Sequence, residues 1–261
     1  MRHYKAIRAW AVVFWLIIWQ LGAMALNQSI ILVSPIQVLV RLAQLSVTAD
    51  FWNAIAYSLC RIALGFIVGI IFGTWLAALS AHFRRIEELL APAMLAVRSI
   101  PVASFIILAL ILFSSHNLSV LISFLMVLPI IYASVLEGIR AADHQLLEMA
   151  KLFRVPPVRC IRYVYLPQVM PYFHSACGSA LGLCWKAGIA AEVIGMPRGS
   201  IGECLQHAKV YLGYSRLVCV DACYCGHQSG IRKGFHCLYE CLYRMAREDL
   251  IYAGYCDTKL M

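Results

Sequence analysis

Two ionisable side chains, Lys186 and Glu192, lie within an apolar run from Phe173 to Met196 that is long enough to cross a membrane. An ionisable group inside a membrane span is costly, which makes both residues candidates for contact with a translocated substrate. Six positions separate them, so they do not share a helical face. A packing or interfacial role is the alternative, with Glu192 near the outer interface and Lys186 extended along its own stem.

The sequence gives little support for catalysis, for nucleic-acid binding or for ATP binding. We find no plausible Ser/His/Asp set, carboxylate pair or H-E-x-x-H motif, and no basic run interleaved with aromatics as a nucleic-acid groove requires. The sequence contains no Gly-Lys pair and therefore no G-x-x-x-x-G-K-[ST] phosphate loop. We expect no enzymatic activity, no cofactor and no hydrolysis of ATP by this chain alone.

The composition predicts an all-α, polytopic membrane protein. Hydrophobic residues make up 62% of the 261 residues and charged residues 13%, about half the charged fraction of a soluble domain. A helical span needs about 20 apolar residues. Five regions meet or approach this length, one of them with a break before Pro101 and one with Pro129 inside: residues 9–26, 62–81, 91–113, 118–138 and 173–196. The connection 27–57 should hold short amphipathic helices, one of which starts at Ser34-Pro35.

Lysine and arginine placement predicts a cytoplasmic N-terminus. In that orientation the inner segments (1–8, 82–90 and 139–170) hold ten basic residues, and the outer segments (27–61, 114–117 and 197–212) hold four. The inner ones are Arg2, Lys5, Arg8, Arg84, Arg85, Arg140, Lys151, Arg154, Arg159 and Arg162, and the outer ones are Arg41, Arg61, Arg198 and Lys209.

The largest inner segment, residues 142–170, is a polar, basic stretch with helix–turn–helix character. Its first helix places Leu146, Leu147, Ala150 and Phe153 on one face, and Pro156-Pro157 ends that helix and begins the next. A solvated loop without a partner would leave that apolar face exposed, so we expect a docking element.

This segment resembles the coupling loop of binding-protein-dependent ABC importer permeases, whose pattern is EAA, three residues, Gly, nine residues, I-x-LP. The matching positions are Glu148-Met149-Ala150, Arg154 in place of the glycine, and Val164-Tyr165-Leu166-Pro167. Residues 98–110, 123–139 and 185–203 extend the resemblance to the nitrate/sulfonate/taurine group, from about residue 8 to residue 212.

The resemblance implies a permease domain over residues 1–212 in the bacterial inner membrane. It implies cytoplasmic ATPase subunits docked on the loop, an extracytoplasmic substrate-binding protein and a second permease copy, with a homodimer expected. The substrate would be nitrate, a sulfonate, taurine or a vitamin precursor. A polytopic enzyme acting on lipid is the alternative from another class, although it would need ionisable residues gathered at one membrane depth.

Arg154 departs from the family pattern. A glycine there would adopt a left-handed backbone conformation at little cost. If Arg154 keeps that backbone, the substitution should cost on the order of 1 kcal/mol.

Residues 213–261 differ in character from the rest. They hold six of the eleven cysteines and no run of span length, so the sixth span of the family fold is missing. A zinc site built from Cys219, Cys223, Cys225, His227, His236, Cys237 and Cys241 has the ligands but not the spacing of a structural site, and a disulfide framework is a second alternative.

We favour a shifted reading frame for this tail. Back-translation from Gly213 with permitted codons, read one base later, gives DTADLFAWTLVIVAISLGFEKVFI, an apolar span where the sixth is expected. The chain would then be a nonfunctional permease remnant that assembles poorly and transports little. Uptake should rise when the gene is corrected by one base, and equal uptake from both genes would refute the shift.

Overall fold

The computed structural model describes residues 9–26 and 33–210, and the tail discussed above lies outside this part. Every regular element in the described part is helical. In chain order they are α1 (Ala9–Leu26), α2 (Pro35–Ser46), α3 (Ala49–His82), α4 (Arg84–Ser99), α5 (Val102–Leu112), α6 (Ser115–Arg140), α7 (His144–Leu152), α8 (Pro157–Cys160), the π-helix η1 (Ile161–Tyr165), α9 (Leu166–Gly195) and α10 (Ile201–Val210). The prediction of an all-α fold is confirmed for these residues.

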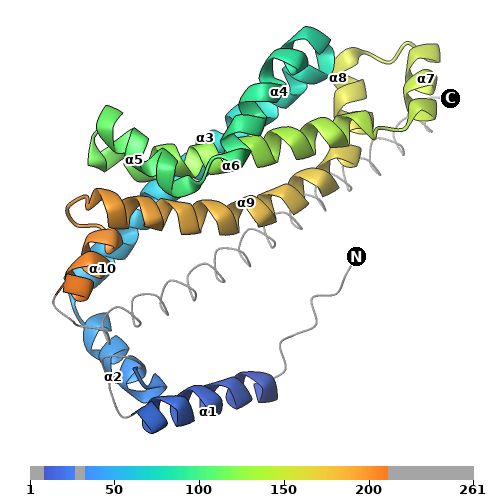
Figure 1. The fold of residues 1–261 in the computed structure, drawn as a ribbon. Helices are drawn as coiled ribbons and strands as arrows, with labels where there is room; N and C mark the ends of the chain where they lie inside the picture. The colour runs from blue at the N-terminus through green and yellow to red at the C-terminus, as the bar shows by residue number, and fades with distance from the viewer. Residues whose placement is uncertain (1–8, 27–32, 211–261) are drawn as a thin grey trace.

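Three long helices, α3, α6 and α9, form the centre of the molecule, and α6 packs against both of the others (Figure 1). The α7–α8 segment lies at one end of this bundle and α10 at the opposite end (Figure 1). The buried core along the bundle is apolar and includes Ile62, Phe66, Val127, Ile131 and Cys184. The α7–α8 segment and α10 are therefore at opposite ends of the protein, and the same three long helices connect them.

Glycines bring α3 and α6 into close contact. A Cβ atom on Gly65 would lie 2.5 Å from the Val120 carbonyl oxygen, and one on Gly69 would lie 2.8 Å from Val127 Cβ. A Cβ on Gly73 would lie 3.0 Å from Ile131 Cβ. Lipid tails are as apolar as leucine, so helices in a bilayer associate through such close packing. The glycine ridge of α3 therefore packs within the subunit.

All five predicted spans coincide with helices; the first has the predicted bounds, and the bounds of the other four differ. The second begins thirteen residues earlier than expected, at Ala49, and the last begins at Leu166. By length and composition, three helical segments of the described part can cross a membrane: Ala49–His82, Ser115–Arg140 and Pro157–Gly195. The pair α4–α5 makes a fourth if it is one span, and the apolar stretch of α1 is shorter. By helix length, therefore, at most four of the five predicted spans can cross a membrane.

The predicted break before Pro101 is confirmed. Helices α4 and α5 meet there at an angle of 104°, because the residue before a proline is driven away from the helical conformation. Arg98, in the last turn of α4, donates a hydrogen bond of 2.6 Å to the carbonyl oxygen of Pro129 in α6. The predicted start of a helix at Ser34-Pro35 is also confirmed, since the Ser34 side chain accepts from the Gln37 amide and caps α2.

The ridge gives a direct test of this packing. In Gly65→Ala the new methyl group would meet a backbone oxygen that cannot turn away, so we expect a loss of about 1–3 kcal/mol in stability. Gly178→Ala in α9 is the matched control, because no atom of another described element lies within 4 Å of its Cβ position. Thermal unfolding of both variants in detergent measures the difference. Equal stability of the two would contradict the close packing of α3 on α6.

Candidate functional site

The strongest candidate site is the hairpin formed by α7, α8 and the turn between them. Helix α7 begins after Asp143, whose side chain accepts a hydrogen bond of 2.9 Å from the Gln145 amide. Pro157 occupies the first position of α8, where the missing N–H is tolerated. The sequence predicted the start of α8 at the double proline, because proline acts on the backbone locally; the cap at Asp143 was not predicted.

The turn after α7 is a Schellman motif. The amide of Val155 donates to the Ala150 carbonyl at 2.9 Å, and the amide of Arg154 donates to the Lys151 carbonyl at 3.1 Å. This pattern places Arg154 in the left-handed position that glycine favours, and its φ is indeed 51°. The backbone expected of the family glycine is therefore retained, with arginine in its place.

The hairpin exposes apolar side chains along its whole length. Within α7, α8 and η1 no residue is buried. Leu152 is 80% exposed, Phe153 71% and Val158 76%. Leu147 and Ala150, which belong to the same predicted apolar face, are half-buried, so only part of that face is fully exposed. A contiguous apolar surface of this kind on a polar, basic loop is typical of a site that binds another protein.

The end of the hairpin joins α9 without a break in helical structure. Residues Ile161–Tyr165 form a π-helix, and the Leu166 amide bonds to the Ile161 carbonyl. Pro167 lacks the N–H that an α-helix would need there, which favours the wider turn. Val164 is half-buried and Leu166 is 46% exposed. The hairpin is therefore attached to the long core helix α9 with little flexible chain between them.

Glu148 lies on the concave side of the hairpin. It pairs with His144 one turn earlier, with 3.2 Å between His144 Nδ1 and Glu148 Oε1. Both side chains also line a cavity of about 450 Å³, which is enclosed by the two arms of the hairpin together with Lys151, Arg154, Pro156 and Tyr165. Such an exposed pair contributes little to stability, so Glu148 remains available to a partner.

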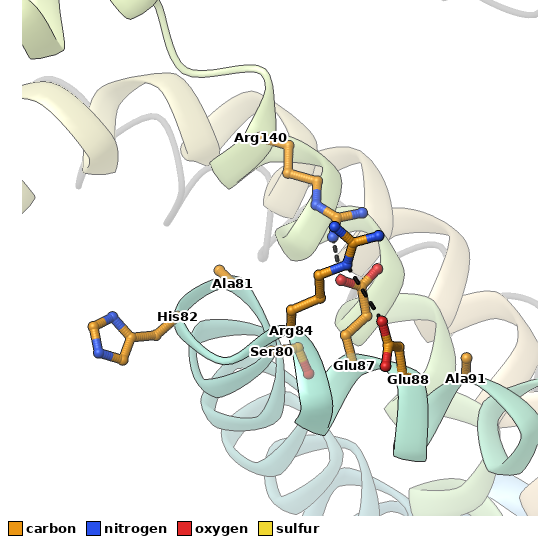
Figure 2. Close-up of a pocket in the computed structure, with 8 residues that line it drawn as sticks. All are labelled: Ser80, Ala81, His82, Arg84, Glu87, Glu88, Ala91 and Arg140. Carbon is orange, nitrogen blue, oxygen red and sulfur yellow. Dashed lines mark hydrogen bonds and ion pairs between the residues drawn. The ribbon is translucent and has the colours of Figure 1, made fainter.

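A second cavity, of about 570 Å³, lies where α3 and α6 end and α4 begins, next to the start of the hairpin (Figure 2). Arg140 from α6 pairs with Glu87, and Arg84 Nε lies 3.3 Å from Glu88 Oε1. His82 points away from these carboxylates (Figure 2). Each arginine of this cavity has an acidic partner, so the cluster connects α4 to α6 and leaves no spare positive charge for an anion.

The two charged residues of α9 occupy different environments. Lys186 is exposed, in line with Ser175 and Ser179, two other exposed residues of the same helix. Glu192 is fully buried, at 0% exposure, and accepts a hydrogen bond of 2.5 Å from Ser58 of α3. Helix α10 folds back over this position and excludes Glu192 from solvent, and its depth near the outer interface stays a prediction. Ser58 itself carried no signal in the sequence.

The described residues contain no group of three or more His, Cys, Asp or Glu side chains close enough to hold a metal ion. The cysteines and histidines of the zinc alternative lie outside this part of the chain.

The fold and the hairpin together define a transporter permease. A crystal structure of an amino acid ABC transporter matches 79% of this chain and 96% of its own, with a TM-score of 0.56 at 17% sequence identity, which shows the fold. Residues 65–220, more than half of the chain and the whole of the hairpin, match the model of the binding-protein-dependent transport system inner membrane components. The chain belongs to this family.

Curated relatives agree with this assignment. The chain is 30% identical to an aliphatic sulfonates transport permease protein of Escherichia coli K12, over 75% of this chain and 74% of the relative. It is 24% identical to the taurine transport system permease protein of the same organism, over 74% and 72%. A bicarbonate transport system permease protein of Synechococcus elongatus is 29% identical over 55% and 52%. The protein is thus a multi-pass inner-membrane permease subunit of an ABC importer and not an enzyme.

The strained turn can be relaxed by mutation. Arg154→Gly removes the Cβ that disfavours φ of 51°, and should stabilise the hairpin by about 1 kcal/mol. Hydrogen exchange of the Val155 amide should then slow about fivefold. Arg154→Ala is the control, since it removes the charge and keeps the Cβ. If both variants slow exchange equally, the effect comes from charge and not from backbone strain.

Proposed function

We propose that the hairpin of residues 142–170 is the surface through which a cytoplasmic ATPase drives this permease. The exposed apolar side chains of α7 and α8 support this, because they lie beside basic residues on a loop that the charge distribution assigns to the cytoplasm. The sequence has no phosphate loop, so the energy of transport must come from another chain.

The attachment of the hairpin supports a mechanical role. It follows α6 within a few residues and continues through η1 into α9, so both of its ends enter core helices. Closure of two ATPases would displace the hairpin as a rigid unit, and α6 and α9 would follow. Motion transmitted to the core would switch the permease between inward and outward access. A second permease copy, which we propose is identical, would complete the translocation path.

Leu152→Glu tests the docking surface. This side chain is 80% exposed, so the charge should leave the fold intact and abolish co-purification of the ATPase subunit. Val47→Glu is the matched control, because Val47 is 85% exposed at the far end of α2. Capture of the ATPase by Leu152→Glu at the level of the control would contradict the proposal.

We propose further that the substrate is a small anion such as nitrate, bicarbonate, a sulfonate or taurine, or else a vitamin precursor, delivered by an extracytoplasmic binding protein. Lys186 supports an anion. It is an exposed cation within a membrane span, and Ser175 and Ser179 continue its face along α9. Among the described residues no neighbouring atom lies within 4 Å of the Cβ position of Gly178 in the same helix, so they leave this part of the helix surface uncovered.

Substitution of Lys186 tests the anion path. Lys186→Met removes the charge at similar length and should raise the KM for uptake of an anionic substrate about tenfold, because a charged hydrogen bond is lost. Lys186→Arg retains the charge and should keep uptake near the original level. An unchanged KM in Lys186→Met would exclude this residue from the path.

A further inference from the structure

The buried carboxylate of Glu192 has no role in the coupling hairpin or in the exposed face of α9. It lies in the last turns of α9, at the end of the bundle opposite the hairpin (Figure 1). A buried carboxylate requires hydrogen-bond partners, because its desolvation is otherwise costly. The structure provides one such partner for the side chain, Ser58 of α3, and it packs α10 directly against the backbone of the same residue.

One chain of hydrogen bonds connects three helices through this carboxylate. The Ile201 amide, in the first turn of α10, donates to Ser58 Oγ at 3.0 Å. Ser58 Oγ, on α3, in turn donates to Glu192 Oε2, on α9, at 2.5 Å. We call this chain, from Ile201 through Ser58 to Glu192, the Glu192 network. Its members are all buried: Ser58 is 1% exposed and Ile201 4%.

Next to the Glu192 network the backbones of α9 and α10 are in direct contact, with no side chain between them. A Cβ on Gly202 would lie 2.3 Å from the carbonyl carbon of Glu192, so the first turn of α10 rests directly on the backbone of α9. The corner before it holds Met196 at φ 45°, whose amide donates to the Glu192 carbonyl at 2.8 Å. The backbone and the side chain of Glu192 therefore both fix this corner.

A charged side chain, that of Arg61, lies three positions after Ser58 on the same helix α3. Arg61 is itself held by Tyr57 and by Asn117 Oδ1, the latter at 3.2 Å. Among the described residues Glu192 Oε1 makes no hydrogen bond within the usual distance, so the connection to α3 and α10 depends on Oε2.

We propose that Glu192 is a positioning residue that holds the first turn of α10 against α3, so that the ends of α3, α9 and α10 opposite the hairpin move as one unit. Glu192 Oε2 does so by accepting the hydrogen bond of the Ser58 hydroxyl, which itself accepts one from the Ile201 amide of α10. The hairpin acts on α9 at its other end, so a permease without the network would receive the motion of the hairpin but would not pass it to α3 and α10.

Hydrogen exchange of the full chain in lipid nanodiscs tests the network directly. Ser58→Ala and Glu192→Met remove the bridge and the acceptor, and each should speed exchange of the α10 amides about tenfold. Glu192→Gln keeps an acceptor oxygen and should restore slow exchange. Glu88→Gln, an exposed glutamate at the hairpin end, is the matched control and should have no effect.

Exchange of α6 distinguishes positioning from general stability. Glu192→Met keeps a similar side-chain volume and removes the hydrogen bond to Ser58, so a positioning role predicts that residues 118–138 exchange at the original rate. Unchanged exchange of α10 in Ser58→Ala and Glu192→Met would overturn the proposal. Equal acceleration in α6 and α10 would also overturn it, because Glu192 would then stabilise the whole bundle.

Transport by the assembled importer gives a second measurement, which rests on the proposed function. Glu192→Met should keep ATP hydrolysis, since the hairpin is intact, and lose about tenfold in uptake, and Glu192→Gln should recover it. Unchanged uptake in Glu192→Met would refute a role in transport. If the unsubstituted chain binds no ATPase, the proposed function fails, and the exchange measurement still decides whether the network positions α10.

Discussion

The close approach of α3 to α6 is the constraint on which the rest of the structure depends. Inside a bilayer, apolar surface provides no net attraction between helices, so they associate by direct packing and by interhelical hydrogen bonds. The three glycines of the α3 ridge allow side chains and carbonyls of α6 to lie where a Cβ would otherwise be. Gly188 repeats the arrangement from α9, where a Cβ would lie 2.7 Å from Ile62 and 2.8 Å from the Ser123 hydroxyl.

A bundle packed in this way behaves as a rigid connection between its two ends. At one end the hairpin is inserted between α6 and α9, which pack extensively on each other. At the other end a short, strained corner returns the chain from α9 into α10. Close-packed cores move as units instead of deforming continuously. A displacement imposed at the hairpin therefore reaches the α10 corner by way of helices that move together.

The hairpin was predictable because its determinants are local. Asp143 caps α7, Pro157 starts α8, and the left-handed residue follows α7 by the spacing that a Schellman turn requires. The break at Pro101 and the start of α2 at Ser34-Pro35 were correct for the same reason. The boundaries of α3 and α9 were not, since the polar residues before Ile62 and Phe173 continue the helices beyond the apolar runs.

The burial of Glu192 was not predicted, for a physical reason of a different kind. Its depth along α9 can be counted from the sequence, but its burial depends on α10 folding back and on Ser58, 134 positions earlier in the chain. Two glycines of α9 also differ: a Cβ on Gly188 would meet Ile62 and Ser123, whereas among the described residues no neighbouring atom lies within 4 Å of the Gly178 Cβ position. Helical spacing alone cannot distinguish two such faces of one helix.

The sequence by itself determined the membrane character of the chain, the hairpin with its turn, and the family pattern within it, because hydropathy, capping and proline geometry act within a few residues. Only the tertiary structure decided which helix receives the glycine ridge, which face of α9 is open at Lys186, and that a buried carboxylate joins α3, α9 and α10. Those features depend on contacts between segments tens of residues apart, and the chemistry of either segment alone does not specify them.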